Sequence, residues 1–119
     1  MFLRKKDVYF KYSTEEQWTG EYWLDGKKIY SKVILVTGFD SEDKYVPHNI
    51  SDLYRVLSCD LFMKTSDRTN HMMPRAHKDD DHDGISIQIT KTNLILQVGK
   101  SNGFQNATGY AILKYIKVT

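Results

Sequence analysis

The densest group of side chains that could do chemistry lies at residues 77–84, which read HKDDDHDG. Closely spaced carboxylates could hold Ca²⁺ through their oxygens, and the imidazoles of His77 and His82 could hold a softer metal. A calcium loop needs ligands at alternate positions and a glutamate at its twelfth position, and this run has neither feature. We therefore interpret residues 77–84 as a solvated polar loop without a metal. A metal site and a polar receptor contact are the alternatives.

The same run closes a longer polar stretch, residues 66–83 (SDRTNHMMPRAHKDDDHD), which contains Pro74 and shows neither a helical nor a strand period. Long unpatterned loops are uncommon in small domains and are often functional. We therefore expect the protein to contact a ligand through this stretch. The candidate binding residues are His71, Arg75, His77, Asp79, Asp81 and His82.

The sequence lacks the residue patterns of an enzyme site. The four histidines are scattered, no serine stands in a G-x-S-x-G motif, and no glycine-rich phosphate loop is present. Cys59 lies inside an apolar strand pattern, VLSCDLFM, which favours a buried and unreactive thiol over an activated nucleophile. We therefore expect a protein that is not an enzyme and that holds no cofactor.

Length and composition narrow the class of protein. A chain of 119 residues fits one domain, and 40% hydrophobic with 27% charged residues is ordinary for a globular protein. Seventeen basic and fifteen acidic side chains give a net charge of +2, which is too balanced to favour nucleic acid as a partner. No run of eighteen apolar residues is present, and charge near the start replaces the apolar core of a secretion signal. We therefore expect neither membrane insertion nor secretion.

Alternating apolar residues predict six to eight strands. These are expected at residues 7–12, 21–24, 29–36, 45–50, 55–64, 85–90, 94–98 and 108–118, with Pro47 placing its strand at a sheet edge. One or two short helical turns are expected, from the capping-box pattern at residues 13–16 and near residues 51–54. We predict an all-β fold, an antiparallel β-sandwich or jelly-roll-like domain over residues 12–119. Residues 1–11 form an N-terminal arm or an initial strand in this interpretation.

The clearest single feature is a hairpin centred on Asp25-Gly26. Asp-Gly between two apolar runs is typical of a type I′ turn, in which both central residues adopt positive φ. Trp18, Tyr22 and Trp23 could be core or could form a recognition surface, and we favour core because aromatic side chains are usually buried. The residues that we assign to this scaffold hairpin are Trp23, Asp25, Gly26 and Tyr30.

The hairpin and the residues before it resemble a β-module found in structural proteins of bacteriophages. The words YSTEEQ, W and LDGKKIYSKVI match the module at residues 12–16, Gly20, Trp23, residues 25–27, Ile29, Tyr30 and Lys32. The final stretch, residues 109–119, is similar to the hydrophobic strand that closes the module, and His48-Asn49-Ile50 is similar to its middle segment. The resemblance therefore runs from Tyr12 to Thr119.

Such modules occur in tail fibres, in baseplate or minor tail proteins, and in head fibres. The resemblance implies a non-enzymatic virion surface protein, made in the host cytoplasm, that forms a homotrimer and binds host-surface glycan or protein. Only eleven residues precede the matched stretch, which favours a small accessory protein that docks on other virion proteins. The alternative function is therefore a structural capsid or tail decoration protein that docks through its N-terminal arm.

Overall fold

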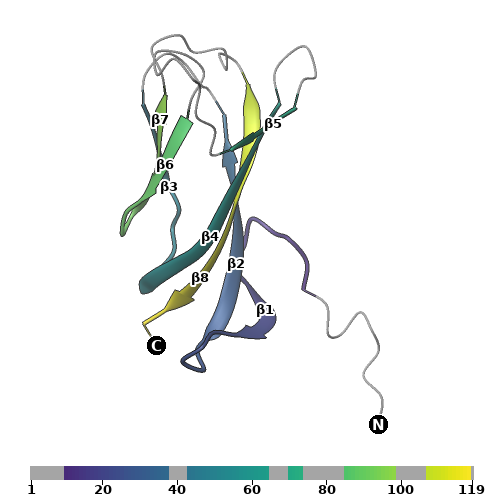
Figure 1. Ribbon diagram of the computed structural model, residues 1–119, viewed down its shortest axis with the longest axis vertical. Helices are drawn as coiled ribbons and strands as arrows, with labels where there is room; N and C mark the ends of the chain where they lie inside the picture. Colours follow the sequence, from purple (N-terminus) through teal and green to yellow (C-terminus); the bar gives the residue numbers. More distant parts are fainter. Residues whose placement is uncertain (1–9, 38–42, 65–69, 74–84, 99–106, 119) are drawn as a thin grey trace. The chain divides into compact units, whose positions relative to one another are not determined.

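The computed structural model describes residues 10–37, 43–64, 70–73, 85–98 and 107–118, and every regular element in these ranges is a β-strand. Figure 1 shows these strands. Their bounds are β1 (Gln17–Tyr22), β2 (Lys28–Val36), β3 (Lys44–Pro47), β4 (Leu53–Lys64), β5 (Asn70–Met73), β6 (Ile85–Ile89), β7 (Asn93–Val98) and β8 (Thr108–Lys117). The all-β prediction is therefore confirmed.

The strands form two antiparallel sheets. The five-stranded sheet has the order β1-β2-β8-β4-β5, and the three-stranded sheet has the order β3-β7-β6. β3 lies at the edge of its sheet, as Pro47 predicts, because a proline lacks the amide hydrogen that an inner ladder requires. The edge strand β1 pairs with β2 in the hairpin that the Asp25-Gly26 turn predicts.

The chain divides into two compact units, and β2, β4 and β8 run through both of them. The first unit contains Met1–Ile34, Ile50–Cys59 and Ile112–Thr119, and the second contains Leu35–Asn49 and Asp60–Ala111. In the second unit the two sheets form separate layers (Figure 1). Their inward side chains are fully buried and make a sandwich core of Val36, Leu61, Met63, Leu94, Leu96 and Ala111. The first unit has its own buried residues, Ile34, Ile50, Leu113, Tyr115 and Ile116.

Neither expected helical turn occurs in the described ranges. The hydroxyl of Ser13 accepts a hydrogen bond from the amide of Glu15 at 3.0 Å, two residues along, instead of the amide three residues along that a capping box requires. The carbonyl of Ser13 accepts a hydrogen bond from Val33 in β2 at 2.8 Å. This long-range bond joins the segment to β2. Near residue 52 the chain makes a turn with positive φ at Asn49 and Asp52, and β4 begins directly after it.

Three other expectations are corrected. The stretch at residues 66–83 is not without strand structure, because Asn70–Met73 forms β5 and pairs with β4 from Leu61 to Lys64. The initial strand expected at residues 7–12 does not include residues 10–12, and residues 1–9 lie outside the described ranges. Cys59 is half-buried in β4, less enclosed than the strand pattern suggests.

Candidate functional site

The loop of the β1–β2 hairpin is a three-residue loop of the kind that contains a bulge. The amide of Trp23 donates a hydrogen bond to the carbonyl of Lys27 at 2.8 Å, and the amide of Gly26 donates to the carbonyl of Trp23 at 2.9 Å. Gly26 has a φ of 84°, whereas Asp25 is not among the described residues with positive φ. The expected type I′ turn is therefore wrong. Leu24 and Asp25 are the central residues, and Gly26 supplies the left-handed position that follows them.

β1 contains an irregularity that brings two aromatic side chains together. Trp18 pairs with Tyr30 and Tyr22 pairs with Lys28, so three residues of β1 lie opposite the single residue Ile29 of β2. Gly20 lies in this bulge with a φ of 88°, a backbone conformation that residues with a Cβ rarely adopt. Residues four apart in a regular strand are separated by about 13 Å. Here the rings of Trp18 and Tyr22 meet edge to face with centroids 5.7 Å apart.

The side chain of Thr19 replaces the ladder hydrogen bonds that the bulge interrupts. Its hydroxyl donates to the carbonyl of Ile29 at 2.9 Å and accepts from the amide of Glu21 at 3.2 Å. The indole Nε1 of Trp18 donates to the carbonyl of Glu21 at 3.2 Å. These bonds fix the position of Trp18, although the residue itself is 42% exposed.

An aromatic row crosses three neighbouring strands of the first unit. Trp18 of β1 is paired with Tyr30 of β2, and the ring of Tyr30 stacks on that of Tyr115 of β8 at 6.2 Å between centroids. Trp18 is exposed, Tyr30 is half-buried and Tyr115 is fully buried. A lysine lies over each of the first two rings of the row, with Lys28 Nζ 4.8 Å from the centroid of Trp18 and Lys117 Nζ 5.5 Å from that of Tyr30.

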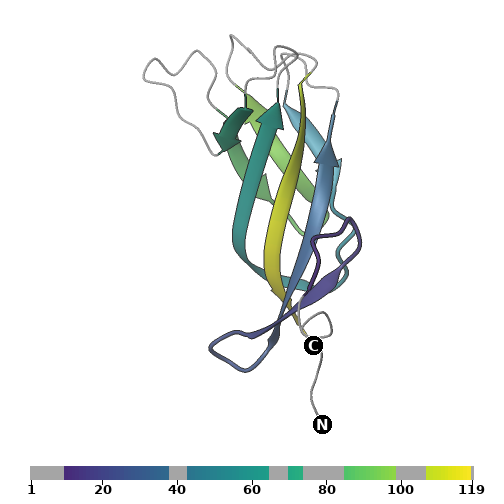
Figure 2. The same cartoon turned by 90° about the vertical axis from the view of Figure 1, so that its right-hand side faces the viewer.

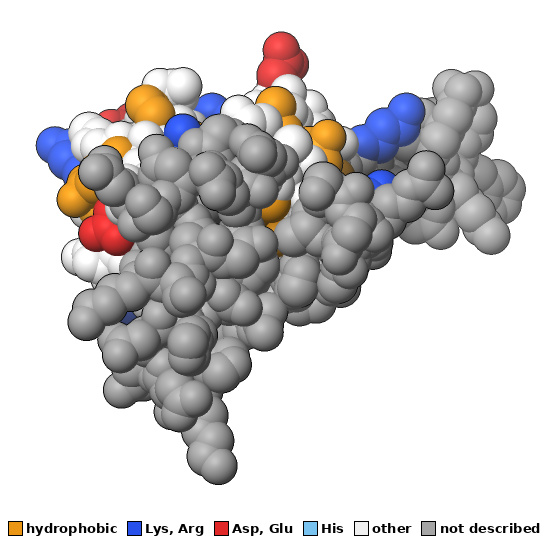
Figure 3. Space-filling view, turned by 90° about the horizontal axis from the view of Figure 1, so that it is seen from above, with side chains coloured by type: hydrophobic (Ala, Val, Ile, Leu, Met, Phe, Trp, Pro, Cys, Tyr) orange, Lys and Arg blue, Asp and Glu red, His pale blue; other side chains and the backbone are white. Residues whose placement is uncertain are grey.

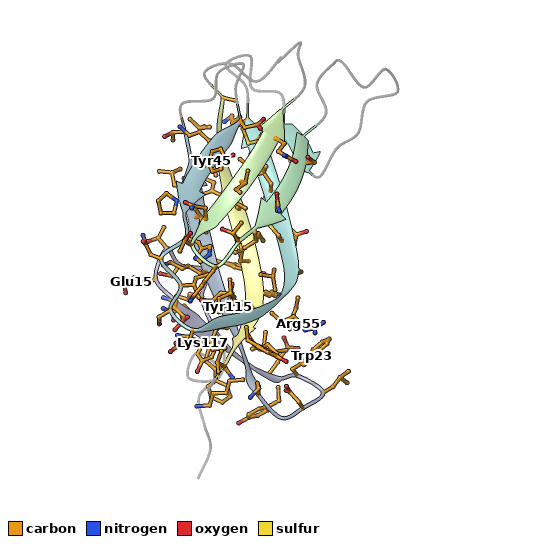
Figure 4. The ribbon with its side chains drawn as sticks, turned by 90° about the vertical axis from the view of Figure 1, so that its left-hand side faces the viewer. Glu15, Trp23, Tyr45, Arg55, Tyr115 and Lys117 are labelled. Atoms are coloured by element: carbon orange, nitrogen blue, oxygen red, sulfur yellow. The ribbon has the colours of Figure 1, made fainter. Side chains whose placement is uncertain are left out.

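The buried end of the row is held by a carboxylate. The Tyr115 hydroxyl donates to Glu16 Oε1 at 2.7 Å, and Lys117 Nζ lies 3.1 Å from Glu16 Oε2. Burial raises the pKa of the Tyr115 phenol well above its usual range, and its hydrogen bond to Glu16 raises it further. Lys117 also donates to the hydroxyl of Ser51 at 3.4 Å. Figure 4 shows Tyr115 and Lys117 in the same part of the first unit.

We define the hairpin surface as Trp18, Tyr22 and Lys28, which share one side of the β1–β2 hairpin through the pairings above. Trp18 and Tyr22 are 42% and 58% exposed, and Trp23 is exposed as well, so the interpretation of these three aromatics as core is wrong. The physical reason is that β1 is an edge strand whose hairpin loop projects beyond the neighbouring strands (Figure 2). At the tip of that loop Leu24 is 91% exposed.

Sequence reasoning missed Leu24, Lys28 and the bulge. A glycine inside a strand pattern is a signal for a bulge, so Gly20 could have indicated it. Lys28 gave no signal, because its contact with Trp18 depends on the bulge in the facing strand.

Seen from above, hydrophobic side chains of the described residues form only small separate patches (Figure 3).

The binding residues expected at residues 66–83 are only partly described. His71 lies in β5, where its backbone pairs with Met63 of β4. The other five, Arg75, His77, Asp79, Asp81 and His82, lie outside the described ranges. The scaffold residues all lie in the hairpin: Asp25 and Gly26 in the loop, Trp23 at its start (Figure 4) and Tyr30 in β2. Asp25 Oδ1 accepts a hydrogen bond from the amide of Lys27 at 2.9 Å.

Among the described residues no three histidine, cysteine, aspartate or glutamate side chains gather in a way that could hold a metal ion. The same ranges contain no helix with the length and apolar character needed to cross a membrane. Comparison with protein-family models, with curated proteins and with solved structures gave no match to this chain.

Proposed function

We propose that this chain is a non-enzymatic surface protein of a bacteriophage virion and that its hairpin surface binds a glycan of the host cell. The residues that carry the resemblance to phage modules are concentrated in the segment from Tyr12 to Lys32. That same segment forms the β1–β2 hairpin and presents Trp18 and Tyr22 to solvent. We therefore assign glycan binding to the segment that carries the resemblance.

The observation that carries the proposal is the exposed and fixed pair of rings at Trp18 and Tyr22. Exposing two large aromatic side chains forgoes the stabilisation of roughly 1.5–3 kcal/mol that burial of a large apolar side chain provides. The bulge, the Thr19 hydroxyl and the Trp18 indole hydrogen bond hold the rings before any ligand arrives. A surface ordered in advance binds with a smaller loss of conformational entropy.

The polar groups of the hairpin favour a glycan over an apolar partner. The hydroxyl of Tyr22 and the indole N–H of Trp23 make no hydrogen bond to another residue within the described ranges. Lys28 adds an ammonium group next to Trp18. Aromatic rings with a polar end combine a flat apolar face with hydrogen-bonding groups. A sugar ring presents C–H groups on its faces and hydroxyls at its rim, so it matches that combination.

The test is binding of the labelled protein to an array of purified bacterial surface polysaccharides. Trp18→Ala and Tyr22→Ala should each abolish the signal, and Tyr22→Phe, which lacks only the hydroxyl, should weaken it. Tyr45→Ala is the matched control, because Tyr45 is an exposed tyrosine of the other sheet. Binding that survives both hairpin substitutions, in variants that melt like the parent, would contradict the glycan proposal.

A second candidate, a capsid or tail decoration protein that docks through residues 1–11, is favoured by a different observation. The carbonyl of Ser13 is bound to Val33 and the carboxylate of Glu16 to Tyr115, so the residues just after this arm are anchored on the sheet. An arm bound to another virion protein would then hold the folded chain on the particle, because the residues that follow the arm are bonded to the sheet. Deletion of residues 1–11 should then remove the protein from purified particles and leave polysaccharide binding unchanged. The glycan proposal predicts that incorporation is retained when Trp18 is replaced.

A further inference from the structure

An exposed apolar row lies on the second unit, on the face of the five-stranded sheet opposite its buried core. It consists of Leu35 in β2, Tyr110 in β8 and Phe62 in β4, which are 50%, 52% and 39% exposed. Both sequence neighbours of Leu35 and of Phe62 are buried, as are Gly109 and Ala111 on either side of Tyr110. The three side chains therefore point away from the core. We call them the outer row.

The strand order places the three residues on neighbouring strands of the five-stranded sheet. β8 lies between β2 and β4. Leu35 and Tyr110 therefore lie on adjacent strands, and both point away from the core. A Cβ built on Gly109 would meet the carbonyl of Phe62 and the sulfur of Met63, so the next residue, Tyr110, lies beside Phe62. The outer row thus spans three adjacent strands.

Two charges of opposite sign flank the row on β4. Asp60 and Lys64 are exposed and lie two residues to either side of Phe62, on the same face of the strand. Neither side chain makes an ion pair with a residue in the described part of the chain. The face therefore carries an acidic side chain on one side of an apolar row and a basic side chain on the other.

We propose that this face binds the same face of a second copy of the chain about a twofold axis that lies along the outer row. Rotation about that axis reverses the strand direction, so each outer-row residue meets its own counterpart. Asp60 of each copy then meets Lys64 of the other, which gives two ion pairs. A twofold contact requires a surface that is complementary to itself, and opposite charges on either side of an apolar row satisfy this requirement.

The proposal differs from the homotrimer that the phage resemblance implies. A row that contacts itself about a twofold axis closes with two copies and leaves no equivalent surface for a third. Three apolar side chains with two ion pairs make a small contact, so the dimer should be weak and should dissociate on dilution. The outer row and the hairpin surface share no residue, so the dimer does not depend on the glycan proposal.

Sedimentation equilibrium over concentrations from about 10 μM to 1 mM tests the proposal, a range that brackets weak association. The mass should rise toward that of two chains. Asp60→Lys and Lys64→Asp should each weaken association by about tenfold or more, because like charges then face each other. The double variant D60K/K64D should restore the parental association constant to within about twofold, since the charges are complementary again.

Phe62→Thr should also weaken the dimer, since threonine removes apolar area and retains a preference for strands. Tyr45→Thr on β3 is the control and should leave association unchanged. A monomer throughout the range, a trimer, or failure of the double charge exchange to rescue single variants that melt like the parent would each overturn the proposal.

Discussion

The hydroxyl of Tyr115 donates a hydrogen bond of 2.7 Å to the carboxylate of Glu16 across 99 positions of the sequence. This bond joins the segment before the first strand to the last strand. Tyr115 is fully buried, and the other oxygen of the same carboxylate pairs with Lys117. The aromatic row that begins at the exposed Trp18 therefore ends at a buried hydrogen bond. The contribution of that bond to the stability of the fold depends on pH.

Tyr115→Phe should reduce the decline in stability at alkaline pH. The pKa of Tyr115 is raised in the folded state, so its neutral phenol favours folding fully below the unfolded tyrosine pKa of about 10. Above that pH the unfolded chain loses the proton and the folded chain keeps it. The free energy of unfolding should then fall by up to about 1.4 kcal/mol per pH unit. Urea titrations at several pH values from 8 to about 11 should show this slope in the parent and a shallower slope in the variant.

Glu16→Gln provides the control for that experiment, because the amide oxygen can still accept a hydrogen bond from Tyr115 while the ion pair with Lys117 is lost. Both partners of that pair are partly exposed, so the loss at neutral pH should stay below about 1 kcal/mol. Tyr115→Phe at neutral pH should destabilise the fold by about 1.5 kcal/mol, the contribution of a hydrogen bond to a charged group. Equal alkaline slopes in the parent and the phenylalanine variant would contradict the role of Tyr115.

Thr19→Val should destabilise the bulge, because valine has the shape of threonine without its hydroxyl. The change removes the donor to the Ile29 carbonyl and the acceptor for the Glu21 amide at a buried position. We expect a loss of about 1–3 kcal/mol in the free energy of unfolding and weaker polysaccharide binding. Thr19→Ser, which keeps the hydroxyl, should lose less in both measurements. If valine and serine behave alike, the hydroxyl does not hold the bulge.

Gly26 and Gly109 are required for different reasons, and substitutions should separate them. Gly26 has a φ of 84° with no atom within 4 Å of an added Cβ, so Gly26→Ala should destabilise by about 1–2 kcal/mol through backbone strain alone. Gly26→Asn should be milder, because asparagine tolerates the left-handed conformation. At Gly109 the added Cβ would overlap the Phe62 carbonyl and the Met63 sulfur. Gly109→Ala should lower the free energy of unfolding by about 2–3 kcal/mol, because the added Cβ overpacks the core. Gly109→Asn should lower it by more, because its side chain is larger.

Thermal and urea unfolding of these four glycine variants checks the two patterns. A milder effect of asparagine than of alanine at position 109 would show that space is not the constraint there.

Most strands were predictable from the sequence because their pattern is local. The Asp25-Gly26 pair located the first hairpin, and alternation located β4, β7 and β8 within a few residues of their observed bounds. The turn type was not predictable, since it depends on the hydrogen bond between Trp23 and Gly26. β5 was missed because its four residues gain their strand form by pairing with β4.

The candidate site was less predictable than the fold. Burial of an aromatic residue depends on which elements cover it. The residues near Trp18 in the sequence do not indicate that β1 is an edge strand, so its exposure could not be predicted. The expected helical turn after Ser13 failed for a similar reason, because the bond from Val33 outweighs a local capping pattern. The contact between Lys28 and Trp18 requires both the bulge and the pairing of the two strands.

β8, the last strand along the chain, lies between β2 and β4 in the five-stranded sheet. While a ribosome is still making the residues before Thr108, β2 and β4 each present an unpaired edge where β8 will later bind. Unpaired strand edges are sites of aggregation and proteolysis. Nascent chains stalled before residue 108 should therefore be sensitive to protease and prone to bind chaperones. Chains stalled after residue 117 has left the ribosome should resist the protease, because β8 then pairs with β2 and β4 together.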